Sequence, residues 1–128
     1  MHSRGTSGPI PDLKIFLIFP LHFSSMNVAI TGGNGHIGAN LIRVLISDGH
    51  QVRSLFHVHR NAFEGLDMEL VEGGLDQLKT LERLCQGADV VFHLAAQVSI
   101  GGHSMKKLLR INVEGTRNII QACKSQGV

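Results

Sequence analysis

The chain has 128 residues, which is enough for one domain. Its 12 basic and 10 acidic side chains give a net charge of +2, too small to indicate a nucleic-acid partner. The two cysteines, Cys85 and Cys123, belong to no CxxC or Cys/His pattern. We expect them to pack as small apolar residues, in preference to a disulfide or a metal site, and nothing indicates an oxidising compartment.

Residues 1–25 differ in composition from the rest of the chain. Residues 1–12 are rich in Gly, Ser and Pro, which predicts disorder. Residues 15–23 form an apolar run, interrupted by Pro20 and His22, that is shorter than the roughly 20 residues of a membrane span. A signal peptide is one interpretation of this run, and an upstream extension before a functional start at Met26 is the favoured one. We therefore expect a cytoplasmic protein with no membrane partner.

From Met26 onward, strand and helix patterns alternate, as is typical of a parallel sheet covered by helices. Strands are predicted at residues 27–31, 51–56, 68–71 and 89–94, and helices at 36–47, 77–86 and 104–126. A polar loop is expected after the second strand, and the continuous apolar run of the fourth strand predicts that it is buried. Right-handed crossovers would place the strands in the order 3-2-1-4, so the fold class is α/β, a Rossmann-like doubly wound parallel sheet.

Apolar residues mark the inward faces of the predicted helices. In the first helix they recur at helical spacing and predict one buried face: Ile37, Leu41, Ile42, Leu45 and Ile46. In the second helix the inward residues are Leu78, Leu81, Leu84 and Cys85. Asp76 precedes this second helix and is expected to cap it.

A glycine-rich turn joins the first strand to the first helix. Gly32 permits a tight turn, Gly35 lets a diphosphate approach the backbone, and Gly38 lets helix and strand pack closely. The first helical amides, those of His36 and Ile37, would point unpaired N–H groups at the anion. The turn predicts a phosphate-binding unit at the switch point between strands one and four.

Three segments of the chain resemble a known family, the extended short-chain dehydrogenases/reductases. Within it, the chain is similar to the NAD(P)-dependent epimerases/dehydratases and the dihydroflavonol-reductase-like enzymes. The match rests on TGGNGHIG at 31–38, VVFHLAA at 90–96 and NVEGTRN at 112–118. It covers about residues 26–128, so these residues are expected to be the N-terminal part of a dinucleotide-binding domain. The resemblance implies that Leu94, Ala95 and Ala96 line the ribose and diphosphate side of the cofactor.

The resemblance also bears on Asn112 and on the histidine of the fourth strand. Asn112 would support the active site or, with about equal weight, be a buried side chain satisfied by backbone groups. His93 lies within an apolar strand, where we expect a satisfied core histidine in preference to a catalyst.

Two departures from the family pattern concern the cofactor. The position directly after the second strand is His57, with Arg60 close behind and no acidic residue before Glu64. An acidic side chain at this position would accept a hydrogen bond from the ribose 2′-hydroxyl, whereas a basic side chain would bind a 2′-phosphate. Because the residues here are basic, NADP is favoured over NAD. In place of the family's Gly-Asp-Leu/Val, the chain has Gly-Gly-Leu, so adenine recognition is expected at Leu75 and Asp76.

The chain contains no tyrosine. In the family a Tyr-x-x-x-Lys pair transfers protons and holds the ribose, so this catalytic half is expected to lie outside the chain. The expected function is the NAD(P)-binding portion of an oxidoreductase or epimerase that acts on a small-molecule substrate. A non-catalytic dinucleotide sensor and an inert fragment stay open as alternatives. Relatives often pack their final helix against a partner subunit, which also allows a homodimer.

Overall fold

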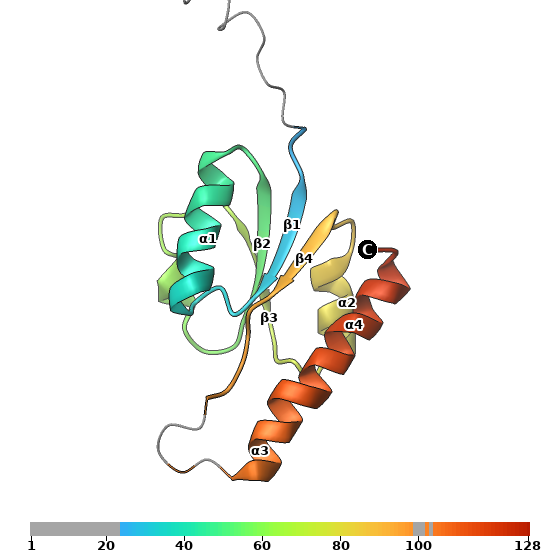
Figure 1. Ribbon diagram of the computed structural model, residues 1–128. Coiled ribbons are helices and arrows are strands. Elements are labelled where there is room, and N and C mark those ends of the chain that lie inside the picture. The colour runs from blue at the N-terminus through green and yellow to red at the C-terminus, as the bar shows by residue number, and fades with distance from the viewer. Residues whose placement is uncertain (1–23, 99–101, 103) are drawn as a thin grey trace, which may run out of the picture.

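A computed structural model describes residues 24–98, 102 and 104–128. The predictions of disorder and of an extension therefore lie almost entirely outside the described residues. Four strands, β1 (Asn27–Thr31), β2 (Gln51–Phe56), β3 (Glu69–Glu72) and β4 (Val90–His93), form a parallel sheet in the order β3-β2-β1-β4 (Figure 1). The predicted strand order and the Rossmann-like fold are confirmed.

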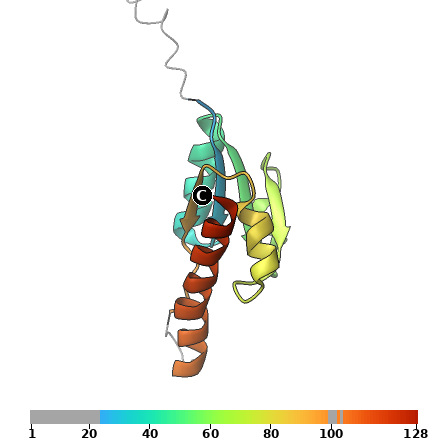
Figure 2. The same ribbon diagram turned by 90° about the vertical axis from the view of Figure 1, so that its right-hand side faces the viewer.

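Helices cover both faces of this sheet. Helix α1 (His36–Ser47) lies on one face, and α2 (Leu78–Cys85) and α4 (Gly115–Gln126) lie on the other (Figures 1 and 2). The predicted helix at 104–126 begins as α3 (Met105–Leu109), passes through a π-helical turn, η3 (Arg110–Glu114), and continues as α4. The predicted polar loop after β2 contains a short 3₁₀ helix, η2 (Arg60–Phe63).

Alternation along β1 divides the buried side chains into two clusters, because successive residues of a strand point to opposite faces. The cluster under α1 contains Val28, Ile30, Ile42, Leu45, Val52 and Phe63. The cluster under α2 and α4 contains Ala29, Leu55, Val71, Leu81, Leu84, Cys85, Ile119 and Ala122. Leu81, Leu84 and Cys85 are fully buried, which confirms the predicted inward face of α2.

Three predictions made from local pattern are wrong. Ile37 is 70% exposed, because it lies in the first turn of α1 beside the glycine turn and not over the sheet with Ile42. Asp76 does not cap α2, since a turn closed by the Gln77 N–H on the Gly74 carbonyl places Gln77 at the N-cap position. Strand β4 is half-buried throughout, because it is an edge strand of the sheet in the described part of the chain.

Candidate functional site

The backbone of the glycine turn leaves no room for side chains at Gly32 and Gly38. Gly32 has a φ of +76°, and a Cβ atom there would lie 2.5 Å from the amide nitrogen of Ala95. Gly38 is buried, and its Cβ would lie 2.8 Å from the Cα of Gly33. The Gly35 N–H closes the turn by donating to the Gly32 carbonyl over 3.1 Å. The turn therefore packs directly against the end of β4 and the start of α1.

The N-terminus of α1 presents bare main chain beside this turn. Gly35 is the N-cap residue, and His36 and Ile37 form the start of the first helical turn, where N–H groups have no acceptor within the helix. No acidic side chain lies in this first turn. A Cβ on Gly35 would meet only the Gly32 carbonyl oxygen, at 3.3 Å. Free amides and the positive end of the helix dipole together favour an anion here.

A cleft of about 520 Å³ lies at the carboxyl edge of the sheet. Its walls come from the glycine turn, the ends of β2 and β4, the loop before α2 and the first turns of the long helix. The lining residues are Gly32, Asn34, Leu55, Phe56, His57, Gly73, Gly74, Leu75, Asp76, Gln77, Ala95, Gln97, Lys107, Arg110 and Ile111. Five of the residues predicted for the site thus lie together: Gly32, His57, Leu75, Asp76 and Ala95.

Seven predicted residues are not part of this lining, and four of them, Gly35, His36, Ile37 and Gly38, belong to the turn and the helix start described above. Arg60 begins η2, beyond the end of β2. Leu94 packs its carbonyl group beneath Gly32, where a Cβ would lie 2.6 Å from the carbonyl carbon. Ala96 is exposed next to the cleft residues Ala95 and Gln97.

The cleft also contains residues that sequence reasoning missed. Lys107, Arg110 and Ile111 come from α3 and η3, and they bring two cationic side chains to the wall. The signal that could have found them is their i, i+3, i+4 spacing, which places all three on one face of a helix. Figure 1 shows this end of the long helix extending past the carboxyl ends of the strands.

A directed chain of hydrogen bonds connects β1, β4 and the long helix behind the cleft. Thr116 Oγ1 donates to the Asn112 carbonyl over 2.7 Å, so it accepts the 3.0 Å bond from His93 Nε2. His93 Nδ1 is then the acceptor for the Thr31 hydroxyl, 2.6 Å away. Thr31 Oγ1 in turn accepts from the Ala95 N–H at 3.4 Å.

Both ring nitrogens of His93 are thus engaged, in agreement with the expectation of a satisfied core histidine. Burial lowers the pKa of His93 below its ordinary value of 6.5, which favours the neutral ring that this chain of bonds requires. His93 ties the end of β1 to the long helix.

Asn112, in the π-helical turn, holds the segment that follows β4. Its Oδ1 accepts from the Gln97 N–H at 2.8 Å, and its Nδ2 donates to the Gln97 carbonyl at 2.9 Å. Both polar groups of the half-buried side chain are therefore satisfied by backbone groups. Of the two alternatives predicted for Asn112, this geometry shows the backbone-satisfied one, and it fixes a residue that lines the cleft.

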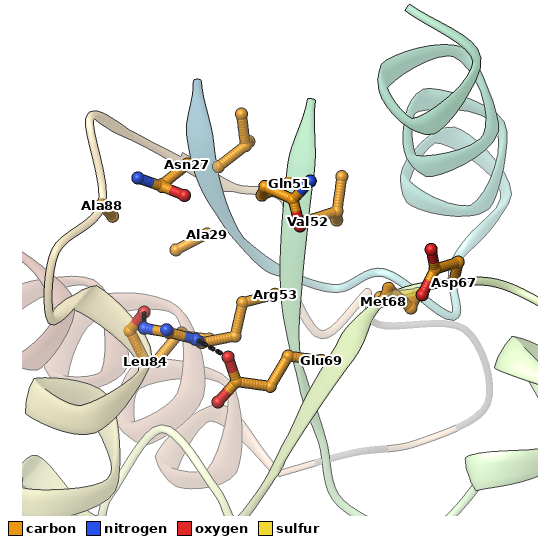
Figure 3. A pocket seen from close by; sticks show the side chains of 11 residues that line it. Asn27, Ala29, Gln51, Val52, Arg53, Asp67, Met68, Glu69, Leu84 and Ala88 are labelled. Carbon is orange, nitrogen blue, oxygen red and sulfur yellow. Dashed lines mark hydrogen bonds and ion pairs between the residues drawn. The ribbon is translucent and has the colours of Figure 1, made fainter. Parts of the chain in front are cut away.

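A second cavity, of about 450 Å³, lies at the opposite, amino-terminal edge of the strands (Figure 3). Its main polar feature is Arg53, whose Nε donates to Glu69 over 2.8 Å. Arg53 Nη1 also donates to the carbonyls of Arg83, Leu84 and Gln86, at the end of α2. The guanidinium is thus used in joining β2 and β3 to the C-terminus of a helix. Within the described ranges, no three His, Cys, Asp or Glu residues gather as a metal site would require.

No helix in the part of the chain that the structure covers has the length and apolar character needed to span a bilayer.

Comparison with known proteins places the chain in a family. Residues 29–128 match the 3-beta hydroxysteroid dehydrogenase/isomerase family. The sterol demethylase protein B of Methylococcus capsulatus is 34% identical over 105 residues, which are 80% of this chain and 32% of that protein. A putative dihydroflavonol 4-reductase of Synechocystis is 37% identical over 101 residues, 77% of this chain and 29% of the relative.

A solved structure agrees with this result. A short-chain dehydrogenase/reductase superfamily protein of Agrobacterium tumefaciens, crystallised with bound NAD, superposes with a TM-score of 0.69 at 28% identity. The superposition covers 80% of this chain and 30% of that protein. The chain therefore spans about a third of the length of the relatives it matches. It belongs to the 3-beta hydroxysteroid dehydrogenase/isomerase family, within the extended short-chain dehydrogenases/reductases, and has their NAD-binding fold.

Proposed function

We propose that residues 26–128 are the N-terminal part of a dinucleotide-binding domain and that the cleft at the carboxyl edge of the sheet binds NAD(P). One observation carries this proposal: the free amides of α1 and the bare turn at Gly32 lie beside a cleft that reaches the ends of β2 and β3. A dinucleotide needs this combination, because its diphosphate requires donors and its adenosine requires a neighbouring groove.

In this proposal each predicted residue has a place. The turn of Gly32, Gly35 and Gly38, with the amides of His36 and Ile37, binds the diphosphate. Leu75 and Asp76 line the adenine end of the cleft. Leu94, Ala95 and Ala96 lie along the ribose and diphosphate side, where small or backbone-exposing residues permit close approach.

We propose NADP as the preferred cofactor. His57, Lys107 and Arg110 line the cleft, against the single carboxylate of Asp76. Arg60 follows three residues after His57 and adds positive charge outside the lining. An excess of cationic groups stabilises a third phosphate, whereas a carboxylate at the end of β2 would repel it.

The parent activity that fits this site is oxidoreductase or epimerase chemistry on a small-molecule substrate. When bound, the nicotinamide supplies the hydride acceptor or donor. The residues of this chain bind and orient the cofactor, and His93 and Asn112 hold the backbone around it. Hydride transfer in the family uses a Tyr-x-x-x-Lys pair, which these 128 residues do not contain because they include no tyrosine.

Isothermal titration of the purified chain with NADP and with NAD tests the proposal. We expect saturable binding of both and a lower Kd for NADP. In Lys107→Gln/Arg110→Gln protein, the preference for NADP should fall, while Arg60→Gln, outside the lining, should change it less. Failure of both nucleotides to bind would overturn the assignment of the cleft, and equal affinities would overturn only the NADP preference.

We propose a non-catalytic dinucleotide sensor as the alternative function, because the glycine turn and the cleft account for nucleotide binding alone. Stopped-flow absorbance with NADPH and a panel of ketones and aldehydes separates the two functions in the longest form of the protein expressed from its gene. Oxidation of NADPH would exclude the sensor, and binding without turnover would support it.

A homodimer through the long helix is also a proposal. Met105, Leu109 and Val113 are exposed at four-residue spacing, and Ile120 continues the exposed apolar set in α4. Apolar side chains in such an arrangement are suited to packing against another helix. Sedimentation velocity over a range of concentrations should reveal a dimer, which Leu109→Glu should dissociate.

A further inference from the structure

The two cysteines of the chain, which are 38 residues apart in sequence, lie side by side in the fold. Cys85 is the last residue of α2, Cys123 lies in α4, and their Sγ atoms are 3.9 Å apart. Both are free thiols in the structure. The sequence contains no other cysteine, so each thiol has one partner available within the chain.

The packing around the pair holds the two helices together. Cys85 is fully buried, and Cys123 is partly buried against the same cluster as Leu81 and Ile119. Farther along the same helices, Ser125 Oγ donates to Glu82 over 3.3 Å. A disulfide needs its sulfurs about 2.05 Å apart, so the sulfurs must approach by roughly 2 Å. Rotation about the two Cα–Cβ bonds moves each sulfur by that order of distance.

We propose that Cys85 and Cys123 are an oxidation site, at which hydrogen peroxide or an organic hydroperoxide converts the two thiols into an intramolecular disulfide. The Cys123 thiolate attacks a peroxide oxygen, the O–O bond breaks, and a sulfenic acid forms while hydroxide or an alkoxide leaves. The Cys85 sulfur then attacks the sulfenic sulfur, the S–O bond breaks, and hydroxide leaves and takes up the thiol proton as water. The two sulfurs lose two electrons, and the peroxide is reduced by two.

The surroundings assign the order of these two steps. Burial, together with the neighbouring Cys123 thiol, raises the pKa of Cys85 to about 12. A thiol that remains protonated is a poor nucleophile toward peroxide, and Cys85 also has no exposed surface. The partly exposed Cys123 therefore reacts first, and Cys85 resolves the sulfenic acid.

The bond would join the helix that follows β3 to the helix that follows β4. Cys85 lies at the C-terminal end of α2, whereas the cleft meets the other end of that helix, at Asp76 and Gln77. A disulfide that closes a loop of this length restricts the unfolded chain and raises Tm by several degrees or more. We expect it to leave nucleotide affinity unchanged, because no cleft residue has to move.

Intact-mass spectrometry of the full chain after peroxide treatment tests the proposal. The mass should fall by about 2 Da, for two lost hydrogens. Alkylation after denaturation should label no thiols, and dithiothreitol should restore both labels and the lower Tm. Cys85→Ala protein should instead gain oxygen at Cys123, while Cys123→Ala protein should react more slowly than either. Oxidised wild-type protein in which both thiols are still alkylated, or only intermolecular dimers on a non-reducing gel, would overturn the proposal.

Discussion

Gly35 offers a test of the phosphate site that leaves the fold in place. Its φ of −76° is one that any residue adopts, and an added Cβ would meet only the Gly32 carbonyl oxygen, at 3.3 Å. We expect Gly35→Ala to cost about 1 kcal/mol of folding free energy or less, because alanine is a poorer N-cap than glycine. We nevertheless expect the new methyl group to obstruct the approach of a diphosphate to the free amides of α1.

The loss of nucleotide affinity follows from the bonds that the methyl group would block. A hydrogen bond from a backbone N–H to a charged phosphate contributes about 1.5 to 3 kcal/mol. Losing one such bond corresponds to a roughly 10- to 150-fold increase in Kd. Gly35→Val, with a branched side chain at the same point, should abolish measurable binding.

Titration calorimetry with NADP and thermal unfolding by circular dichroism should be run on the same protein preparation. Gly32→Ala is the contrasting variant, because its φ of +76° and the 2.5 Å contact with Ala95 predict loss of the fold itself. A Gly35→Ala protein that unfolds normally and binds NADP within twofold of the wild type would refute the placement of the diphosphate.

Three further predictions concern the supports of the fold. Arg53→Met should cost about 2 kcal/mol of unfolding free energy, because the carbonyls at the end of α2 lose a charged donor. Glu69→Gln, which alters only the half-exposed ion pair, should cost less than about 1 kcal/mol in the same urea titration, and equal costs would refute this ranking. Burial lowers the pKa of His93, so the unfolded chain binds that proton more readily and the free energy of unfolding should fall as the pH drops below about 6.5. His93→Gln should reduce this pH dependence, and an unaltered pH profile would count against it. Asn112→Ala removes both bonds to the Gln97 backbone and should cost about 1 to 2 kcal/mol, with faster hydrogen exchange at the Gln97 amide as the specific readout.

The agreement between sequence and structure is best where a residue's role depends on its own neighbours in the chain. The turn at 31–38 needs glycine for local steric reasons, and the structure shows the crowding at Gly32 and Gly38 directly. The inward residues of α2 follow from helical periodicity alone. The predictions failed where the start of an element depends on a competing turn, as at Asp76, or where the first turn of a helix lies beside the glycine turn, as at Ile37.

The local sequence pattern could not predict contacts between residues that the crossover connections bring together. The spacing of Lys107 and Arg110 places them on one face of a helix, but it does not indicate that they line the same cleft as His57. The approach of Cys85 to Cys123 likewise depends on how α2 and α4 pack on the same face of the sheet. The roles of Thr31 and Thr116 as partners of His93 depend on the registry of β1 with β4 and on the position of the long helix.

The amino-acid sequence alone determined the order of strands and helices, the parallel sheet and the glycine turn, since these follow from side-chain periodicity, the handedness of crossovers and the steric freedom of glycine. Tertiary structure alone decided which side chains form the far wall of the cleft, which nitrogen of His93 carries the proton and that the two thiols are neighbours. The physical reason is that such contacts join residues distant in the chain, whose separation is set by the packing of whole elements and not by any local preference.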